Sequence, residues 1–204
     1  MAQPANVHAL DFNLLPRLRT YRVFLSLDNE CKKALAKLPE TLARANSACH
    51  RCDEARGDGA SETKGAALRS ALAEFVSMEE SLARDLNSAG IVAAPVKITE
   101  SQNPLLHVIR EFRNLETHLQ MSRLRSVMKE VTYGGANHQL DIWMVEDITE
   151  SDFMKLRNSR RYKRDDVVKM VDWFNEAQKK WGIDQLIYRA VVEYCRLLIK
   201  AYSL

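Results

Sequence analysis

The residues best suited to chemistry lie in one stretch, 103–121, which reads NPLLHVIREFRNLETHLQM. Arg113, Asn114 and His118 follow one another there in the order R-N-x-x-x-H. An imidazole can accept and return a proton near neutral pH. A guanidinium can hold the negative charge of a phosphate through two parallel hydrogen bonds. Together these side chains could therefore act on a phosphodiester.

An ideal α-helix through this stretch would have one apolar face and one polar face. The apolar face would carry Leu105, Val108, Phe112, Leu115 and Leu119. The opposite face would carry His107, Arg110, Asn114, His118 and Met121. Arg113 would lie between the two faces, with a side chain long enough to reach around. The apolar face would form part of the core, which leaves the polar face for a ligand or a partner.

The R-N-x-x-x-H segment, with its polar residue after the Arg and its apolar lead-in LLHVIREF, resembles the signature of the HEPN superfamily. The resemblance implies a helical bundle that forms a homodimer, with a composite site where the motif helices of two subunits meet. It also implies an endoribonuclease that needs no metal and no other cofactor. His118 would transfer protons while a ribose 2′-hydroxyl attacks the adjacent phosphate. Arg113 would stabilise the charge on the phosphorane, and Asn114 would orient or contact the phosphate.

The same resemblance implies a role in toxin–antitoxin or phage-defence systems, with RNA and an antitoxin or other protein as partners. Gln120 stands where the branch paired with nucleotidyltransferase antitoxins carries a Tyr, so regulation through that Tyr is not expected. Many HEPN-like proteins lack catalysis, and a non-catalytic helical dimerisation or interaction module is therefore the alternative function. A looser R-x5-H match at Arg44–His50 has Ala after the Arg, and we interpret it as a chance match.

A second candidate site is the basic stretch 156–164, LRNSRRYKR. Clustered cations beside an aromatic side chain, here Tyr162, can follow a phosphate backbone and stack a base. We favour the interpretation as a solvated loop, whose charge the acidic pair at 165–166 partly neutralises; if the protein binds RNA, this loop is the first choice for a backbone contact. With the polar face of the motif helix included, the predicted RNA contacts are His107, Arg110, Arg160, Arg161 and Lys163.

The cysteines predict neither a metal site nor a disulfide framework. Cys49 and Cys52 form a C-x-x-C pair, but zinc needs four ligands and there is no second C-x-x-C or H-x3-H pair. The spacing of all four cysteines is typical of a cytoplasmic protein with reduced thiols. The N-terminus does not read as a signal peptide, and no apolar run is long enough for a membrane span.

The composition is that of an ordinary globular protein, with 204 residues of which 46% are hydrophobic and 28% charged. The net charge of +3 permits a nucleic-acid partner. Apolar periodicity, caps and glycine stops predict helices over 15–37, 40–56, 62–86, 104–130, 149–156, 165–180 and 184–202.

β-Branched and aromatic residues on both sides of Gly134–Gly135 predict a hairpin. We therefore expect a mainly α protein, an antiparallel helical bundle with a small β-hairpin insertion near 131–146. A single HEPN-like domain would span 1–204, with 149–204 as a helical extension beyond a minimal domain of that family.

Overall fold

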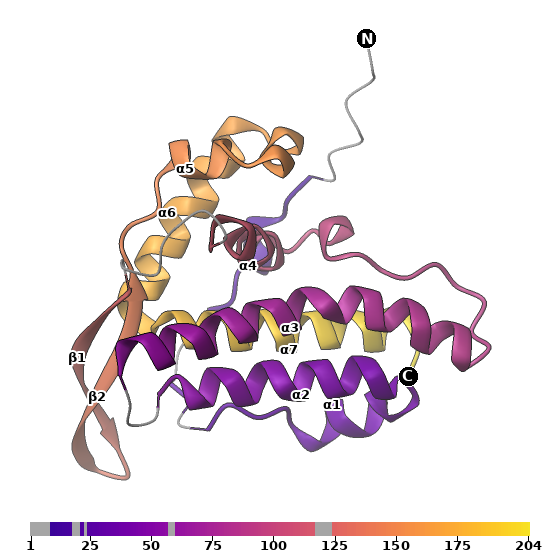
Figure 1. Ribbon diagram of the computed structural model, residues 1–204, viewed down its shortest axis with the longest axis horizontal. Coiled ribbons are helices and arrows are strands. Elements are labelled where there is room, and N and C mark those ends of the chain that lie inside the picture. Colours follow the sequence, from indigo (N-terminus) through magenta and orange to yellow (C-terminus); the bar gives the residue numbers. More distant parts are fainter. Residues whose placement is uncertain (1–8, 18–20, 23, 57–59, 117–123) are drawn as a thin grey trace.

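The computed structural model describes residues 9–17, 21–22, 24–56, 60–116 and 124–204. Within these ranges, seven α-helices and one antiparallel pair of strands make up the protein (Figure 1). The helices are α1 (Asn29–Ala34), α2 (Pro39–Glu54), α3 (Ser61–Ser88), α4 (Pro104–Glu116), α5 (Glu150–Met154), α6 (Arg164–Trp181) and α7 (Ile183–Tyr202). The strands are β1 (Leu124–Tyr133) and β2 (Ala136–Val145). The predicted mainly α fold with a small β insertion is confirmed.

The centre of the protein is formed by α7, which packs against α2, α3 and α4. Leu186, Ile187, Tyr194 and Leu198 of α7 have no solvent exposure and belong to one hydrophobic cluster with the apolar residues of those helices. A helix that is buried on most sides has to lie inside a core. The last part of the predicted extension 149–204 is therefore integral to the bundle. None of the described helices is both long and apolar enough to cross a bilayer.

Local signals in the sequence account for several helix ends. Asp28 caps α1, because its Oδ1 accepts a hydrogen bond from the backbone N–H of Cys31 at 2.7 Å. Thr149 and Asp152 form a reciprocal capping box at the start of α5. Gly182 separates α6 from α7 with a φ of +85°, a conformation that L side chains rarely adopt. α5, α6 and α7 consequently begin and end within a few residues of the predicted positions.

The helix predicted over 15–37 is wrong. Within the described part of this range, only α1 and the short 3₁₀ turn after it are helical. Leu25 and Leu27 are buried, whereas the residues at 24, 26 and 28 are exposed. This two-residue alternation is that of an extended chain with one side against a core. The segment lies along α7, where the Tyr188 hydroxyl donates to the carbonyl of Ser26 at 3.1 Å.

The hairpin is confirmed, but it is longer than predicted. β1 pairs with β2 from Leu124 opposite Val145 to Tyr133 opposite Ala136. Gly134 and Gly135 form the turn with φ angles of +61° and +82°, as a two-residue hairpin turn of this hand requires. The helix predicted to reach residue 130 is therefore wrong, because β1 already begins at Leu124. The hairpin extends beyond the helices at one end of the bundle (Figure 1).

Candidate active site on α4

The helix α4 carries the start of the R-N-x-x-x-H segment, and it is enclosed by α3, α5, α6 and α7. Its first turn is held by Asn103, whose Oδ1 accepts from the backbone N–H of Leu105 at 3.0 Å. The predicted apolar positions Leu105, Val108, Phe112 and Leu115 are all buried. His107, which was predicted to lie on the opposite face, is buried as well, and so are Leu106, Ile109 and Glu111, which the prediction assigned to neither face. The prediction of one buried and one open face is therefore only half right.

His107 is only 2% exposed, and both of its ring nitrogens have partners. Nε2 lies 2.7 Å from the carbonyl oxygen of Ser101, which can only accept, so Nε2 carries the proton. Nδ1 lies 2.9 Å from the hydroxyl of Tyr162 and accepts from it in the neutral ring. The placement of His107 on an open face is therefore wrong, and its imidazole is not presented to RNA in this structure.

Tyr162 is buried at the opposite end of that hydrogen bond, with its ring edge-on to the imidazole at a centroid distance of 5.5 Å. Burial and the nearby carboxylate of Glu111 raise the pKa of its hydroxyl. A buried ring cannot stack on a base, so the RNA-binding interpretation of this stretch is wrong where it gives Tyr162 a stacking role. The sequence around Tyr162 could not indicate this burial, because the histidine that it contacts lies 55 residues earlier in the chain.

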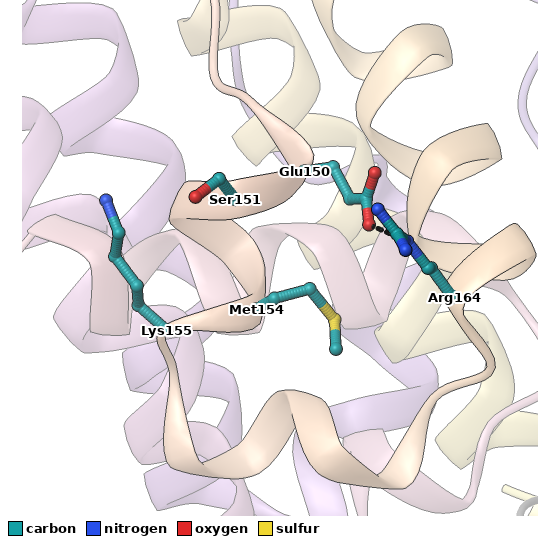
Figure 2. Close-up of a pocket in the computed structure, with 5 residues that line it drawn as sticks. All are labelled: Glu150, Ser151, Met154, Lys155 and Arg164. Atoms are coloured by element: carbon teal, nitrogen blue, oxygen red, sulfur yellow. Dashed lines mark hydrogen bonds and ion pairs between the residues drawn. The ribbon is translucent and has the colours of Figure 1, made fainter.

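The cationic side chains of the basic stretch differ in exposure and in their hydrogen-bond partners. Arg160 and Lys163 are exposed, whereas Arg161 is half-buried and donates from Nε to the carbonyl of Asn158 at 3.0 Å. Arg164 forms an ion pair with Glu150 across a shallow hollow between α5 and the start of α6 (Figure 2). Ser151, Met154 and Lys155 complete the lining of this hollow. The hollow contains no residue of the R-N-x-x-x-H segment.

Glu111 is the polar residue of α4 that sequence reasoning overlooked. Its side chain has no solvent exposure, and carboxylates are rarely buried to this degree without partners. Its Oε2 accepts from Nδ2 of Asn114 at 2.9 Å, and its Oε1 accepts from Nη1 of Arg110 at 3.3 Å. The signal that could have found it is helical spacing, since Glu111 lies three residues before Asn114 and four after His107.

Arg110 lies between two carboxylates. Besides its hydrogen bond to Glu111, its Nε lies 3.9 Å from Oε2 of Glu79 on α3. The other oxygen of Glu79 accepts from the backbone N–H of Ile98. The side chain of Arg110 is 21% exposed, although its Nε is buried and makes no hydrogen bond. Arg110 is therefore a structural cation first and can offer a ligand only its exposed side.

Arg113 is the exposed cation of the motif. Its Nη1 lies 3.5 Å from Oδ1 of Asn114, a long hydrogen bond. No carboxylate among the described side chains lies within ion-pair distance of Arg113. The structure thus brings Arg113, Asn114, Glu111 and Arg110 together on α4. His118, the proposed proton carrier, belongs to 117–123 and lies outside the described residues.

The described residues include no cluster of three or more His, Cys, Asp or Glu side chains that could hold a metal ion. Cys49 and Cys52 are free and buried within α2. Desolvation raises the pKa of both thiols, that of Cys49 to about 12. The C-x-x-C pair therefore lies in the core as neutral thiols.

Comparison with known proteins identifies no family for this chain. No family model, no curated protein and no solved structure matches the chain. The resemblance to the HEPN superfamily consequently depends on the residues of the R-N-x-x-x-H segment and on the chemistry they could perform.

Proposed function

We propose that the protein is a HEPN-like, metal-independent endoribonuclease that acts as a homodimer. The observation that carries the proposal is the Arg113–Asn114 pair. Arg113 is exposed and has no carboxylate partner among the described side chains, while Asn114 beside it is held by a buried carboxylate. An exposed guanidinium with no carboxylate partner among the described side chains can bind a phosphate through two hydrogen bonds.

In the proposed reaction the ribose 2′-oxygen attacks the adjacent phosphorus and the bond from phosphorus to the 5′-oxygen breaks. The products are a 2′,3′-cyclic phosphate and a free 5′-hydroxyl. His118 of one subunit takes the proton from the 2′-hydroxyl, and the protonated His118 of the partner subunit gives a proton to the leaving 5′-oxygen. Arg113 stabilises the additional negative charge on the phosphorane.

Cations near α4 support an RNA substrate. Arg110 and Arg161 both lie close enough to Tyr162 to act electrostatically on its hydroxyl. Arg160 and Lys163 are exposed in the same basic segment. Contacts of this kind to a phosphate backbone bind RNA without regard to sequence and weaken as salt rises. RNA would therefore cross the basic segment on its way to the motif.

The direct test is incubation of end-labelled RNA with the purified protein in excess EDTA. We expect cleavage that leaves 2′,3′-cyclic phosphate ends, and a loss of at least about 100-fold for His118→Ala or Arg113→Ala, since each removes a proton carrier or a charge stabiliser. His50→Ala is the matched control, because His50 is an exposed histidine of the chance R-x5-H match, paired with Glu54 at 3.2 Å. Intact RNA with the unmodified protein, or full activity of His118→Ala, would contradict the proposal.

The second candidate is a non-catalytic helical dimerisation or interaction module. The observation that favours it is the mutual burial of His107 and Tyr162, which removes a predicted RNA contact, His107, and the aromatic ring of the basic stretch from the surface. Under this alternative the protein would form the dimer in sedimentation experiments without cleaving RNA. The variant His118→Ala would then change neither the dimer nor the integrity of cellular RNA.

A further inference from the structure

We propose that Glu111 is a positioning residue that acts through Asn114 to orient the guanidinium of Arg113. The inference rests on the proposed function, in which Arg113 stabilises the transition state. It goes beyond the R-N-x-x-x-H pattern, because Glu111 is not part of that pattern. The three side chains form a chain of contacts, from Glu111 Oε2 to Asn114 Nδ2 at 2.9 Å, and from Asn114 Oδ1 to Arg113 Nη1 at 3.5 Å.

The first step is the burial of Glu111. A carboxylate with no solvent exposure loses its hydration, and only hydrogen bonds and a neighbouring cation can offset that loss. Arg110 provides the cation through Nη1 at 3.3 Å, and Asn114 provides a neutral donor. An apolar residue at this position would avoid the desolvation altogether. We therefore explain the buried carboxylate of Glu111 by the hydrogen bonds with which it holds Asn114 and Arg110.

The second step is the orientation of the Asn114 amide. An amide has a donor end and an acceptor end, and the two ends cannot face the same partner. Oε2 of Glu111 accepts from Nδ2, which turns Oδ1 of Asn114 toward the guanidinium of Arg113. Arg113 has only donors, so this orientation gives it an acceptor. The opposite orientation would place Nδ2 against the guanidinium, where donor would face donor.

The third step is the direction of Arg113. Neighbouring residues of a helix point about 100° apart, so Arg113 and Asn114 do not share a face by position. The long side chain of Arg113 reaches toward Asn114 nevertheless. The contact therefore draws the exposed guanidinium toward the polar side of α4. Asn114 in this arrangement orients the arginine, a role that differs from the direct action on the phosphate that the resemblance implies for it.

The test compares Glu111→Gln with the unmodified protein in the RNA cleavage assay. With an amide at position 111, Asn114 can turn over and present Nδ2 to Arg113. We expect kcat to fall about tenfold, since small losses of orientation in a catalytic group have effects of this order, with KM changed less than about twofold. Asp85→Asn is the matched control, because Asp85 is a buried carboxylate on α3 that accepts from the backbone N–H groups of Glu40 and Thr41. It should leave kcat unchanged.

A double-mutant cycle separates positioning from a general loss of stability. If Glu111 acts through Arg113, Glu111→Gln should change kcat by less than about twofold when Arg113 is already alanine. An equal fall of kcat in both backgrounds, or no fall in the unmodified background, would overturn the inference.

A spectroscopic readout keeps the inference testable if the protein cleaves no RNA. In protein labelled with ¹⁵N at asparagine, the side-chain amide signal of Asn114 should shift in Glu111→Gln and stay unchanged in Asp85→Asn. An unchanged signal in Glu111→Gln would refute the positioning role. Full activity of His118→Ala would refute the proposed function instead, so the two failures can be told apart.

Discussion

Removing the hydroxyl of Tyr162 is the sharpest test of how the basic segment is attached to α4. The change Tyr162→Phe keeps the buried ring and deletes only the donor to Nδ1 of His107, at 2.9 Å. Nδ1 then loses that hydrogen bond where the side chain is only 2% exposed, and water has little access. Loss of a buried hydrogen-bond partner costs about 1–3 kcal/mol. We therefore expect a free energy of unfolding about 2 kcal/mol lower.

The assay is urea unfolding followed by circular dichroism, together with calorimetry. For a chain of this length about 2 kcal/mol corresponds to a fall in Tm of roughly 4–8 °C. Tyr202→Phe is the matched control, since the Tyr202 hydroxyl contacts the backbone at Ala94 and Val96 near the surface. Water can replace those contacts, so the control should cost less than about 1 kcal/mol.

The double variant His107→Leu, Tyr162→Phe completes the test. Because the two residues contact each other, the double variant should cost less than the sum of the single variants by at least about 0.5 kcal/mol. Unchanged stability of Tyr162→Phe together with weaker RNA binding would refute the reasoning. That result would mean that Tyr162 contacts RNA, as the RNA-binding interpretation of the basic stretch would have it.

Three further predictions concern the core. Gly182→Ala should lower stability by about 1–3 kcal/mol in urea unfolding, because only glycine tolerates its backbone conformation and an added Cβ would meet Ile142 and Asp184. Gly90→Ala, also at positive φ but with open space around it, should cost less, and equal costs would contradict this explanation. Burial raises the pKa of all four cysteine thiols, that of Cys31 to about 11, so a thiol reagent at pH 8 should label them slowly before unfolding and rapidly in guanidinium. Rapid labelling of the native protein would contradict the burial of the thiols. Because the folded thiols hold their protons more tightly than the unfolded ones, the free energy of unfolding should fall as the pH rises above the ordinary thiol pKa of 9.0.

Much of the helical framework was readable from local sequence. α2, α3, α6 and α7 lie within a few residues of their predicted positions, because caps, helix-breaking glycines and apolar periodicity act over a turn or two of the same helix. The turn at Gly134–Gly135 was readable for the same reason. The segment 24–28 failed because Leu25 and Leu27 take their places from contact with distant parts of the core, and a short apolar run fits a helix or an extended chain equally well.

In the candidate site, too, some features follow from local sequence and others from tertiary packing. The sequence by itself determined that Arg113 and Asn114 adjoin on a helix, that His107 and Arg110 lie on the same helix, and that the basic segment carries exposed cations. Only the tertiary structure decided that Tyr162 covers His107 and that the carboxylate of Glu111 is buried beneath Asn114. The physical reason is that helical spacing places side chains around one axis, whereas their exposure depends on which distant segments pack against that axis. A polar residue on a helix face can thus hold a ligand or hold the fold, and the packing around α4 assigns His107 to the fold and leaves Arg113 at the surface.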